Sequence, residues 1–524
     1  MRNFIVIILK KYKMKQYDII IVGSGAGGST LAYKLADSGK NILIIERGDF
    51  IPIEKENWDS EAVFVKKKFT TTERWLDKEH KEFQPGQHYN VGGNTKLYGA
   101  ALFRMRENDF NEVKHYGGVS PKWPISYYDL KKYYLEAEKL YAVHGERGSD
   151  PTEPEEENPY LYIPLKHEPR IQQVFDELKN AGLHPFPLPI GLNPNAKNKA
   201  SAPFILDRFD GFPDPTEHKA DAHINALRKA LQLDNVSLMT NAQVTKLYTN
   251  NSGTAISKMD VLHDDEVITL TANLVILSCG AINSAILLLK SANFIFPAGL
   301  ANSSVIVGRK YMFHNNSAMI ALSTTPNDSK FGKTFGINDF YHKSDEFEFP
   351  LGHIQMLGKS DKTQISTDSP IPAPGFTFEM MTKHSVDFWL DSEDLPDPNN
   401  RITLENQKIK INYTPNNLKG HHLLMDKLKY SLKHSGSFSH FMPKNIYFGK
   451  DMDIAAVAHQ NGAIRFGTDP KLSVLDTFCR SHDIKNLFVV DGSFFVSSSA
   501  VNPALTLMAM ALRVGDYIKN ELLN

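Results

Sequence analysis

Two stretches of the chain place residues where they could bind a charged ligand. In the first, Gly23, Gly25 and Gly28 follow the pattern G-x-G-x-x-G, and Glu46 stands at the end of the next apolar run. Glycines let the backbone approach a pyrophosphate, a helix N-terminus neutralises it, and an acid further on binds ribose hydroxyls. These residues predict a dinucleotide site. The alternative is a plain strand–helix–strand unit with a flexible turn.

The second stretch is Asn502-Pro503, which precedes the apolar run "ALTLMAMALRV". Proline suits the first position of a helix, and asparagine suits the cap before it. One interpretation is therefore a core helix with Asn502 as its cap. The other is a helix whose positive N-terminal end points at an electronegative partner inside the protein.

The elements that must position these residues follow from hydrophobic patterning. The first glycine turn lies between a predicted strand at 17–22 and a predicted helix at 26–37, and a second strand follows at 42–45. Another buried strand is predicted at 274–277, and "NLFVVDGSFF" supplies one more. Strands that alternate with helices predict a parallel α/β sheet.

Several glycines and one acid come directly after these strands. Ligands of open α/β sheets gather at the carboxyl ends of strands, so Gly23, Gly280 and Asp491 are expected to converge there. The alternative for Gly280 and Asp491 is that each only ends its strand. A second glycine turn, Gly92-Gly93, precedes small residues that suit a chain passing close to a flat ring.

Composition excludes several classes of function. The 524 residues are 41% hydrophobic and 23% charged, and 59 Lys and Arg against 60 Asp and Glu give a net charge of −1. This balance predicts neither nucleic-acid binding nor attraction to an acidic membrane. The apolar run at 4–9 is too short to span a bilayer, so no transmembrane segment is expected, whether the chain starts at Met1 or at Met14. Two cysteines, Cys279 and Cys479, form no disulfide framework and suggest a cytoplasmic protein.

Two segments differ from the α/β material. Residues 146–160, "ERGSDPTEPEEENPY", predict an acidic loop rather than a packed element. Residues 311–450 contain alternating runs such as "RITLENQKIKINY" behind the turn "LPDPNN". We expect an antiparallel sheet inserted into the α/β unit.

Taken in order, the motifs resemble those of the glucose–methanol–choline (GMC) family of FAD-dependent oxidoreductases. The residues that carry the resemblance are "IIIVGSGAGGSTLAYKL" with Glu46, "VGGNTKLYGAALFR", "WPISYYDLKKYY", "ILSCGAINSAILLL", "VGRKYMFH", "LPDPNNRITL", "AHQNGAIRFG" and "NLFVVDGSFFVSSSAVNPALTLMAMA". They extend over roughly residues 17–518. The "GGNTKLYG" turn and the Asn-Pro pair are similar to the branch that contains pyranose oxidases and sugar dehydrogenases.

The resemblance implies a function and a catalytic pair. His459 and Asn502 would lie above the flavin, with His459 as a neutral base that takes the hydroxyl proton while hydride leaves for the flavin. The helix after Pro503 would point its positive end at the pyrimidine side of the ring. The implied reaction is oxidation of a CH–OH group, with a sugar or glycoside as donor and with oxygen, a quinone or an electron-transfer protein as acceptor.

The resemblance also implies the cofactor contacts and the domains. FAD would contact Gly23, Gly25, Ala26, Gly28, Glu46, Arg47, Gly92, Gly93, Asn94, Val244, Gly280, Asp491, Gly492 and Pro503, and no metal is expected. Because the glycine turn continues as Lys96-Leu97-Tyr98, without the histidine that carries covalent flavin in some pyranose oxidases, non-covalent FAD is expected. The expected parts are an FAD-binding domain (14–145, 220–310 and 451–524), a loop and substrate-side segment (146–219) and a substrate-binding domain (311–450).

Other functions stay open on the sequence. A relative of the lyase type would keep FAD only as a structural group, and donor-dependent bleaching of the flavin distinguishes the two. A non-catalytic flavin-binding protein is disfavoured because His459 and Asn502 are both present. An NAD-dependent dehydrogenase would leave the C-terminal motifs unexplained.

Overall fold

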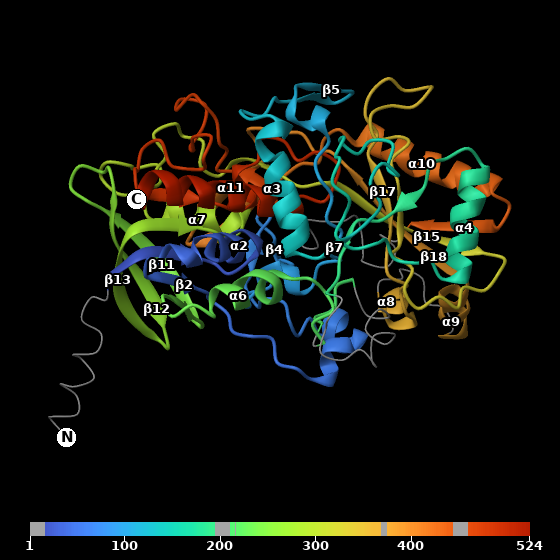
Figure 1. Cartoon of the computed structure of the whole chain (residues 1–524), viewed down its shortest axis with the longest axis horizontal. Coiled ribbons are helices and arrows are strands. Elements are labelled where there is room, and N and C mark those ends of the chain that lie inside the picture. Colours follow the sequence, from blue (N-terminus) through green and yellow to red (C-terminus); the bar gives the residue numbers. More distant parts are fainter. Residues whose placement is uncertain (1–15, 194–209, 215, 368–374, 444–458, 524) are drawn as a thin grey trace.

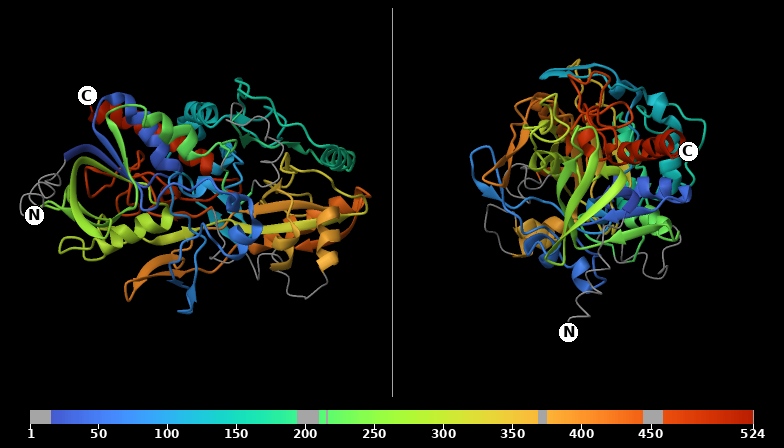
Figure 2. Two further views of the ribbon diagram at one scale, coloured as in Figure 1. Left: turned by 90° about the horizontal axis from the view of Figure 1, so that it is seen from below. Right: turned by 90° about the vertical axis from the view of Figure 1, so that its left-hand side faces the viewer.

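The computed structural model describes residues 16–193, 210–214, 216–367, 375–443 and 459–523. The apolar run at 4–9 and both proposed starts of the chain lie outside these residues. Two halves lie along the long axis of the molecule, one built around a parallel sheet and the other around an antiparallel sheet (Figures 1 and 2). Among the helices that the structure describes, none is long and apolar enough to cross a membrane.

The first half contains a parallel sheet whose strands come from distant parts of the chain. Its order is β10-β2-β1-β13-β23, and every neighbouring pair is parallel. The strands are β1 (Gln16–Val22), β2 (Ile42–Ile45), β10 (Val236–Met239), β13 (Glu266–Leu277) and β23 (Leu487–Val489). Their apolar, mainly β-branched residues are buried on both faces, as in sheets covered by helices. This is the predicted Rossmann-like order, so the α/β prediction is confirmed.

The helices of this half are α2 (Ala26–Leu35), α3 (Tyr127–Leu140), α6 (Arg228–Ala230), α7 (Ala281–Lys290) and α11 (Ala504–Leu522). Three of them, α2, α7 and α11, come after the strands β1, β13 and β23. The C-terminal α11 packs against α2 and α3, so helices from opposite ends of the described chain lie together. An antiparallel extension, formed by β11 (Ala242–Thr249) and β12 (Ile256–His263), pairs with the N-terminal part of β13.

The second half is built on a six-stranded antiparallel sheet with the order β21-β15-β18-β17-β16-β8. Its strands are β8 (Phe186–Pro187), β15 (Asn315–Ser323), β16 (Phe335–Ile337), β17 (His353–Met356), β18 (Ser385–Ser392) and β21 (Phe438–Pro443). The helices α4 (Pro169–Asn180) and α10 (Leu418–His434) share a hydrophobic core with this sheet, and α8 (Lys362–Thr367) and α9 (Gly375–His384) form a smaller one. The predicted antiparallel-sheet part is therefore present.

The predicted hairpin at 401–413 does not lie in that sheet. It forms β19 (Arg401–Glu405) and β20 (Lys408–Asn412), which belong to a mixed sheet with β3 (Trp75–Leu76), β4 (Glu82–Phe83), β14 (Arg309–Met312) and β22 (Asn461–Ala463). The pairing partner of β20 is β3, from the beginning of the chain. Alternation of apolar residues identifies a strand, but this pattern does not indicate with which distant strand the segment pairs.

The acidic loop at 146–160 has no helix or strand, as expected, but it is packed. Its acids pair with buried arginines: Glu156 lies 3.0 Å from Arg104, and Asp150 is bound to Arg106. Both arginines are fully enclosed. The sequence alone did not indicate this packing, because Arg104 and Arg106, which pair with the acids of the loop, are distant from it in the chain.

Candidate active site

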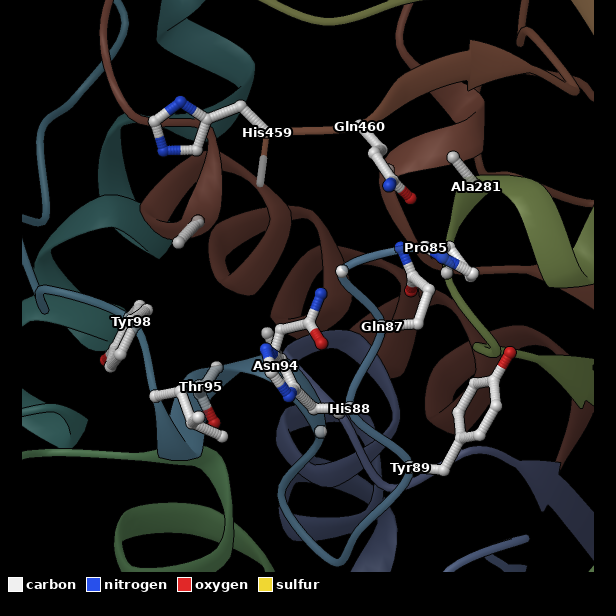
Figure 3. Close-up of a pocket in the computed structure, with 18 of the residues that line it drawn as sticks. Pro85, Gln87, His88, Tyr89, Asn94, Thr95, Tyr98, Ala281, His459 and Gln460 are labelled. Atoms are coloured by element: carbon white, nitrogen blue, oxygen red, sulfur yellow. The ribbon is translucent and has the colours of Figure 1, made fainter. Parts of the chain in front are cut away.

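A cavity of about 780 Å³ lies between the two halves, and most of the sequence-predicted site residues line it. Those at the cavity are Gly23, Gly25, Ala26, Glu46, Arg47, Gly93, Asn94, Val244, Gly280, Asp491, Gly492, Asn502, Pro503 and His459. Figure 3 shows His459 at one corner of the cavity and Tyr89 at the opposite corner, with Asn94 and His88 between them. Residues from both halves of the fold therefore surround one elongated space.

Two of the predicted glycines do not line the cavity. A Cβ on Gly28 would stand 2.0 Å from the carbonyl oxygen of Gly23, so this glycine permits the close approach of helix and turn. Gly92 has φ +95° and donates its N–H to the Ser24 hydroxyl at 3.2 Å, which joins the two glycine turns. Both residues determine the shape of the turns.

Two helices begin at the cavity without a side-chain cap. Gly25 is the N-cap residue of α2, and Pro503 occupies that position in α11; among the described residues, neither helix receives a side-chain hydrogen bond there. Free N–H groups and the positive end of the helix dipole suit an anionic ligand. This observation fits the pyrophosphate of FAD at α2 and an electron-rich ring at α11.

The cap predicted for Asn502 is wrong. Pro503 lies one position earlier than expected, since the helix starts at Ala504 and the Pro503 carbonyl accepts the N–H of Leu507 at 3.0 Å. The Asn502 side chain instead accepts a hydrogen bond from Gln355 Nε2 at 3.1 Å, and its amide nitrogen lies 3.1 Å from His459 Nε2. The residue faces the cavity and His459 rather than its own helix.

Glu46 and Asp491 are buried carboxylates that hold the surrounding turns. Glu46 accepts hydrogen bonds from the Ser24 N–H at 3.0 Å, the Ser24 hydroxyl at 2.7 Å and the Gly48 N–H at 3.1 Å. Asp491 accepts from the Gly280 N–H at 3.0 Å and the Ser284 hydroxyl at 2.5 Å. Burial raises the pKa of both carboxyls, and this effect outweighs the hydrogen bonds, which act to lower it. Gly280 and Asp491 therefore converge, as the strand ends suggested.

His459 is neutral at physiological pH. Burial lowers the pKa of its imidazole to about 4, although the nearby Asp391 carboxylate acts in the opposite direction. A neutral imidazole can accept a proton, so the electrostatics of the site suit a general base.

Sequence reasoning missed much of the cavity wall. Tyr89 and Glu73 line the cavity beside the predicted Arg47, which lies over the Tyr89 ring at 3.7 Å and pairs with Glu73 at 2.7 Å. Further lining residues come from strands, loops and the helix α8, namely Asp210, Lys333, Gln355, Ser360, Gln364 and Trp389. The sequence contains no pattern that marks these residues, because each is supplied singly by a different segment.

Comparisons with known proteins identify the family of this chain. Residues 18–346 match the model of the FAD dependent oxidoreductase family, and residues 399–511 match that of the GMC oxidoreductase C-terminal domain. The fold and the cavity thus belong to a flavoprotein oxidoreductase. The chain belongs to the FAD dependent oxidoreductases, and its C-terminal part matches a GMC oxidoreductase domain, in agreement with the resemblance of its motifs.

The relatives match over nearly the whole chain. The chain is 26% identical to a 2-methyl-1,2-propanediol dehydrogenase of Mycolicibacterium austroafricanum, over 97% of this chain and 96% of the relative. It is 26% identical to the fructose dehydrogenase large subunit of Gluconobacter japonicus, over 96% of this chain and 98% of that subunit. The crystal structure of pyridoxine 4-oxidase from Mesorbium loti superposes with a TM-score of 0.63 at 16% identity, covering 96% of this chain and 99% of that one, and supports the fold.

Proposed function

We propose that this oxidoreductase oxidises a CH–OH group of a sugar or another polyhydroxylated alcohol, with His459 as the base and Asn502 as its partner. The observation that supports this is the contact between the two side chains at 3.1 Å, next to the uncapped start of α11. Two of the relatives are named as dehydrogenases of a diol and of fructose, which agrees with a hydroxyl substrate.

The residues of this chain would perform the following steps. The substrate hydroxyl replaces the Asn502 amide as the neighbour of His459 Nε2, which then removes the hydroxyl proton. Asn502 orients the hydroxyl, and Gln355, which donates to the Asn502 carbonyl oxygen, fixes the direction of that amide. FAD, when bound, supplies the hydride acceptor. The uncapped N-termini of α2 and α11 bind its negative charge.

The wall opposite the dinucleotide turns supports a polyhydroxylated substrate. Asp210 and Lys333 form an ion pair at 2.7 Å at the cavity, and Gln355 and Trp389 also line it. Charged and amide groups bind hydroxyls, and an indole face packs on the C–H face of a sugar ring.

The FAD is proposed to be non-covalent. The glycine turn continues as Lys96-Leu97-Tyr98, without a histidine, and the Lys96 ammonium is bound to Asp221 at 2.7 Å. The Cys279 thiol at the cavity is protonated, because burial raises its pKa to about 12. Acid precipitation should therefore release all flavin into the supernatant, and a yellow pellet would contradict this.

Two further proposals concern the surroundings of the enzyme. The acceptor of the electrons is proposed to be oxygen, a quinone or an electron-transfer protein. A cytoplasmic location is proposed because Cys279 and Cys479 are both free thiols.

The proposal is tested by anaerobic reduction of the flavin with sugars, glycosides, choline and simple alcohols. We expect at least one polyhydroxylated donor to bleach the flavin. His459→Ala should retain FAD and reduce roughly 10²–10⁴ times more slowly, the usual effect of removing a positioned base. A wild-type rate in this variant would contradict the assignment, and a flavin that no alcohol bleaches would favour a structural role for FAD.

A further inference from the structure

A second histidine lies directly behind His459. His314 follows β14, is fully buried, and has its Nδ1 atom 3.0 Å from Nδ1 of His459. On its other side, Nε2 of His314 lies 3.2 Å from the carbonyl oxygen of Ser498. The two imidazoles therefore form a continuous chain from the cavity to the backbone at 498.

With one hydrogen on each ring, the contacts of this chain fix both tautomers. A carbonyl oxygen only accepts, so Nε2 of His314 must carry its hydrogen and Nδ1 of His314 must be an acceptor. Nδ1 of His459 must then carry its hydrogen and donate it to His314. Nε2 of His459, which faces Asn502, is left without a hydrogen and can accept one. The contact with His314 thus holds His459 in the tautomer that can act as a base.

A buried carboxylate stands beside the contact between the two rings. Asp391 is the penultimate residue of β18 and is fully enclosed; its Oδ1 lies 3.6 Å from His314 Nδ1 and 3.9 Å from His459 Nδ1. Oδ1 accepts a hydrogen bond from the Trp389 indole at 2.8 Å. Oδ2 has no hydrogen-bond partner among the described residues.

Positive charge on either ring stabilises the ionised form of Asp391. Burial alone would raise the pKa of this carboxyl, but the interactions with His314 and His459 outweigh burial and lower it. An ionised carboxylate with an unsatisfied oxygen is costly inside a protein unless positive charge can come near it. The site is therefore prepared for a proton that is absent in the resting state.

We propose that His459, His314 and Asp391 form a proton relay, in which the proton taken from the substrate hydroxyl is stored on the imidazole pair beside Asp391. The substrate O–H bond breaks and an Nε2–H bond forms on His459. The Nδ1–H bond of His459 then breaks, and an Nδ1–H bond forms on His314. His459 is neutral again, and the positive charge lies on His314 next to Asp391. No further reactant is needed.

Among the other ionisable groups that face these residues, one lysine and two histidines are either paired or neutral, so Asp391 is the carboxylate that stabilises the stored proton. Lys333 faces His459 and lowers the pKa of His459, but it is paired with Asp210 at 2.7 Å. His353 and His421 face Asp391, and burial lowers their pKa values to about 3 and about 4, so both are neutral.

The inference rests on the proposed role of His459 as base, and proton release during the reaction tests it. Holoenzyme is mixed anaerobically with a good donor in weak buffer containing a pH indicator dye, and flavin absorbance is followed in parallel. In the wild type, we expect the flavin to be reduced before any proton appears in solution. In Asp391→Asn, the proton should appear together with flavin reduction, and the rate should fall about 10-fold. Because the variant loses an anion beside His459, the acid limb of its pH profile should move about one unit to lower pH.

His421→Gln is the matched control. This histidine is also buried and also faces Asp391, but it binds the hydroxyls of Ser317 at 2.8 Å and Ser392 at 2.9 Å and has no contact with the chain to His459. It should keep the wild-type order of events and the wild-type pH profile. Equal behaviour of Asp391→Asn and His421→Gln would overturn the relay.

A second measurement is independent of turnover. In holoenzyme labelled with ¹⁵N-histidine, NMR should show His459 protonated on Nδ1 and bare on Nε2, and His314 protonated on Nε2. The opposite tautomer of His459 would overturn the relay even if no donor is found, whereas the expected tautomers with no active donor would refute only the proposed function. If Asp391→Asn does not fold, His314→Gln replaces it, and early proton release is again expected. A stoichiometric metal ion in the purified protein, held by the same three side chains, would also overturn the relay.

Discussion

Replacing Glu46 separates the contribution of a carboxylate to the glycine turn from its contribution to cofactor binding. Its three accepted hydrogen bonds join the turn at Ser24 to the end of β2 at Gly48. Hydrogen bonds to a charged group contribute about 1.5–3 kcal/mol each, so three give at least ~4.5 kcal/mol. Relief of the buried charge offsets part of this, because burial raises the pKa of Glu46. We expect Glu46→Ala to lower the free energy of unfolding of the apoprotein by ~3 kcal/mol.

The holoenzyme should lose more than the apoprotein. If Glu46 also binds the ribose hydroxyls, a further ~1.5–3 kcal/mol disappears with the cofactor contact, which corresponds to FAD binding weakened about 10- to 150-fold. Urea unfolding of the apo and holo forms, with a titration of FAD, measures both quantities. The control Ser24→Ala removes one hydrogen bond to Glu46 but leaves the carboxylate, so its FAD affinity should change less. Equal destabilisation of apo and holo Glu46→Ala would show that the residue only holds the turn.

Two further predictions follow from buried polar groups. Asn502→Ala should slow anaerobic flavin reduction less than His459→Ala does. It should lower the free energy of unfolding by only ~1 kcal/mol, because the variant loses the contacts to Gln355 and His459 but no helix cap. An unchanged reduction rate would exclude a role of Asn502 in orienting the substrate. Asp109 has its pKa raised to about 7, mainly by burial and then by the charge of Glu393, against an ordinary value of 3.8. The folded protein therefore binds more protons than the unfolded chain between these values, and stability should fall as pH rises through this window. Asp109→Asn should reduce that slope in urea unfolding at pH 5, 6 and 7, and a slope identical to that of the wild type would contradict the assignment.

The sequence was most informative where function depends on local backbone geometry. Glycines between a strand and a helix, and an acid after the next strand, predicted the βαβ unit because each step involves neighbours in the chain. The expected strand at 42–45 is the observed β2, and β1 and α2 differ from the expected bounds by one or two residues.

Long-range relations were beyond the same reasoning. The hairpin at 401–412 pairs with β3 rather than with the substrate-side sheet, since the partner of a strand depends on the whole fold. His314 and Asp391 are buried next to His459. Their local sequence does not differ from that of a histidine or an aspartate on the surface, so it did not indicate a buried hydrogen-bonded group. Asn502 had two local interpretations, and only the position of Gln355 decided between them.

The parallel sheet has a consequence for the synthesis of the protein. Its strand β1 is made first, yet its neighbour β13 follows only after residue 265, and the edge strand β23 is supplied by residues 487–489. Gly27 of α2 packs so closely on the carbonyl of Val490 that a Cβ would stand 2.0 Å from it. A nascent chain on the ribosome therefore lacks the edge strand β23 and the helix α11 until almost the whole message has been translated. We expect early termination, even by the last few dozen codons, to give an insoluble product without flavin rather than a smaller active enzyme, and chaperones to be needed during elongation.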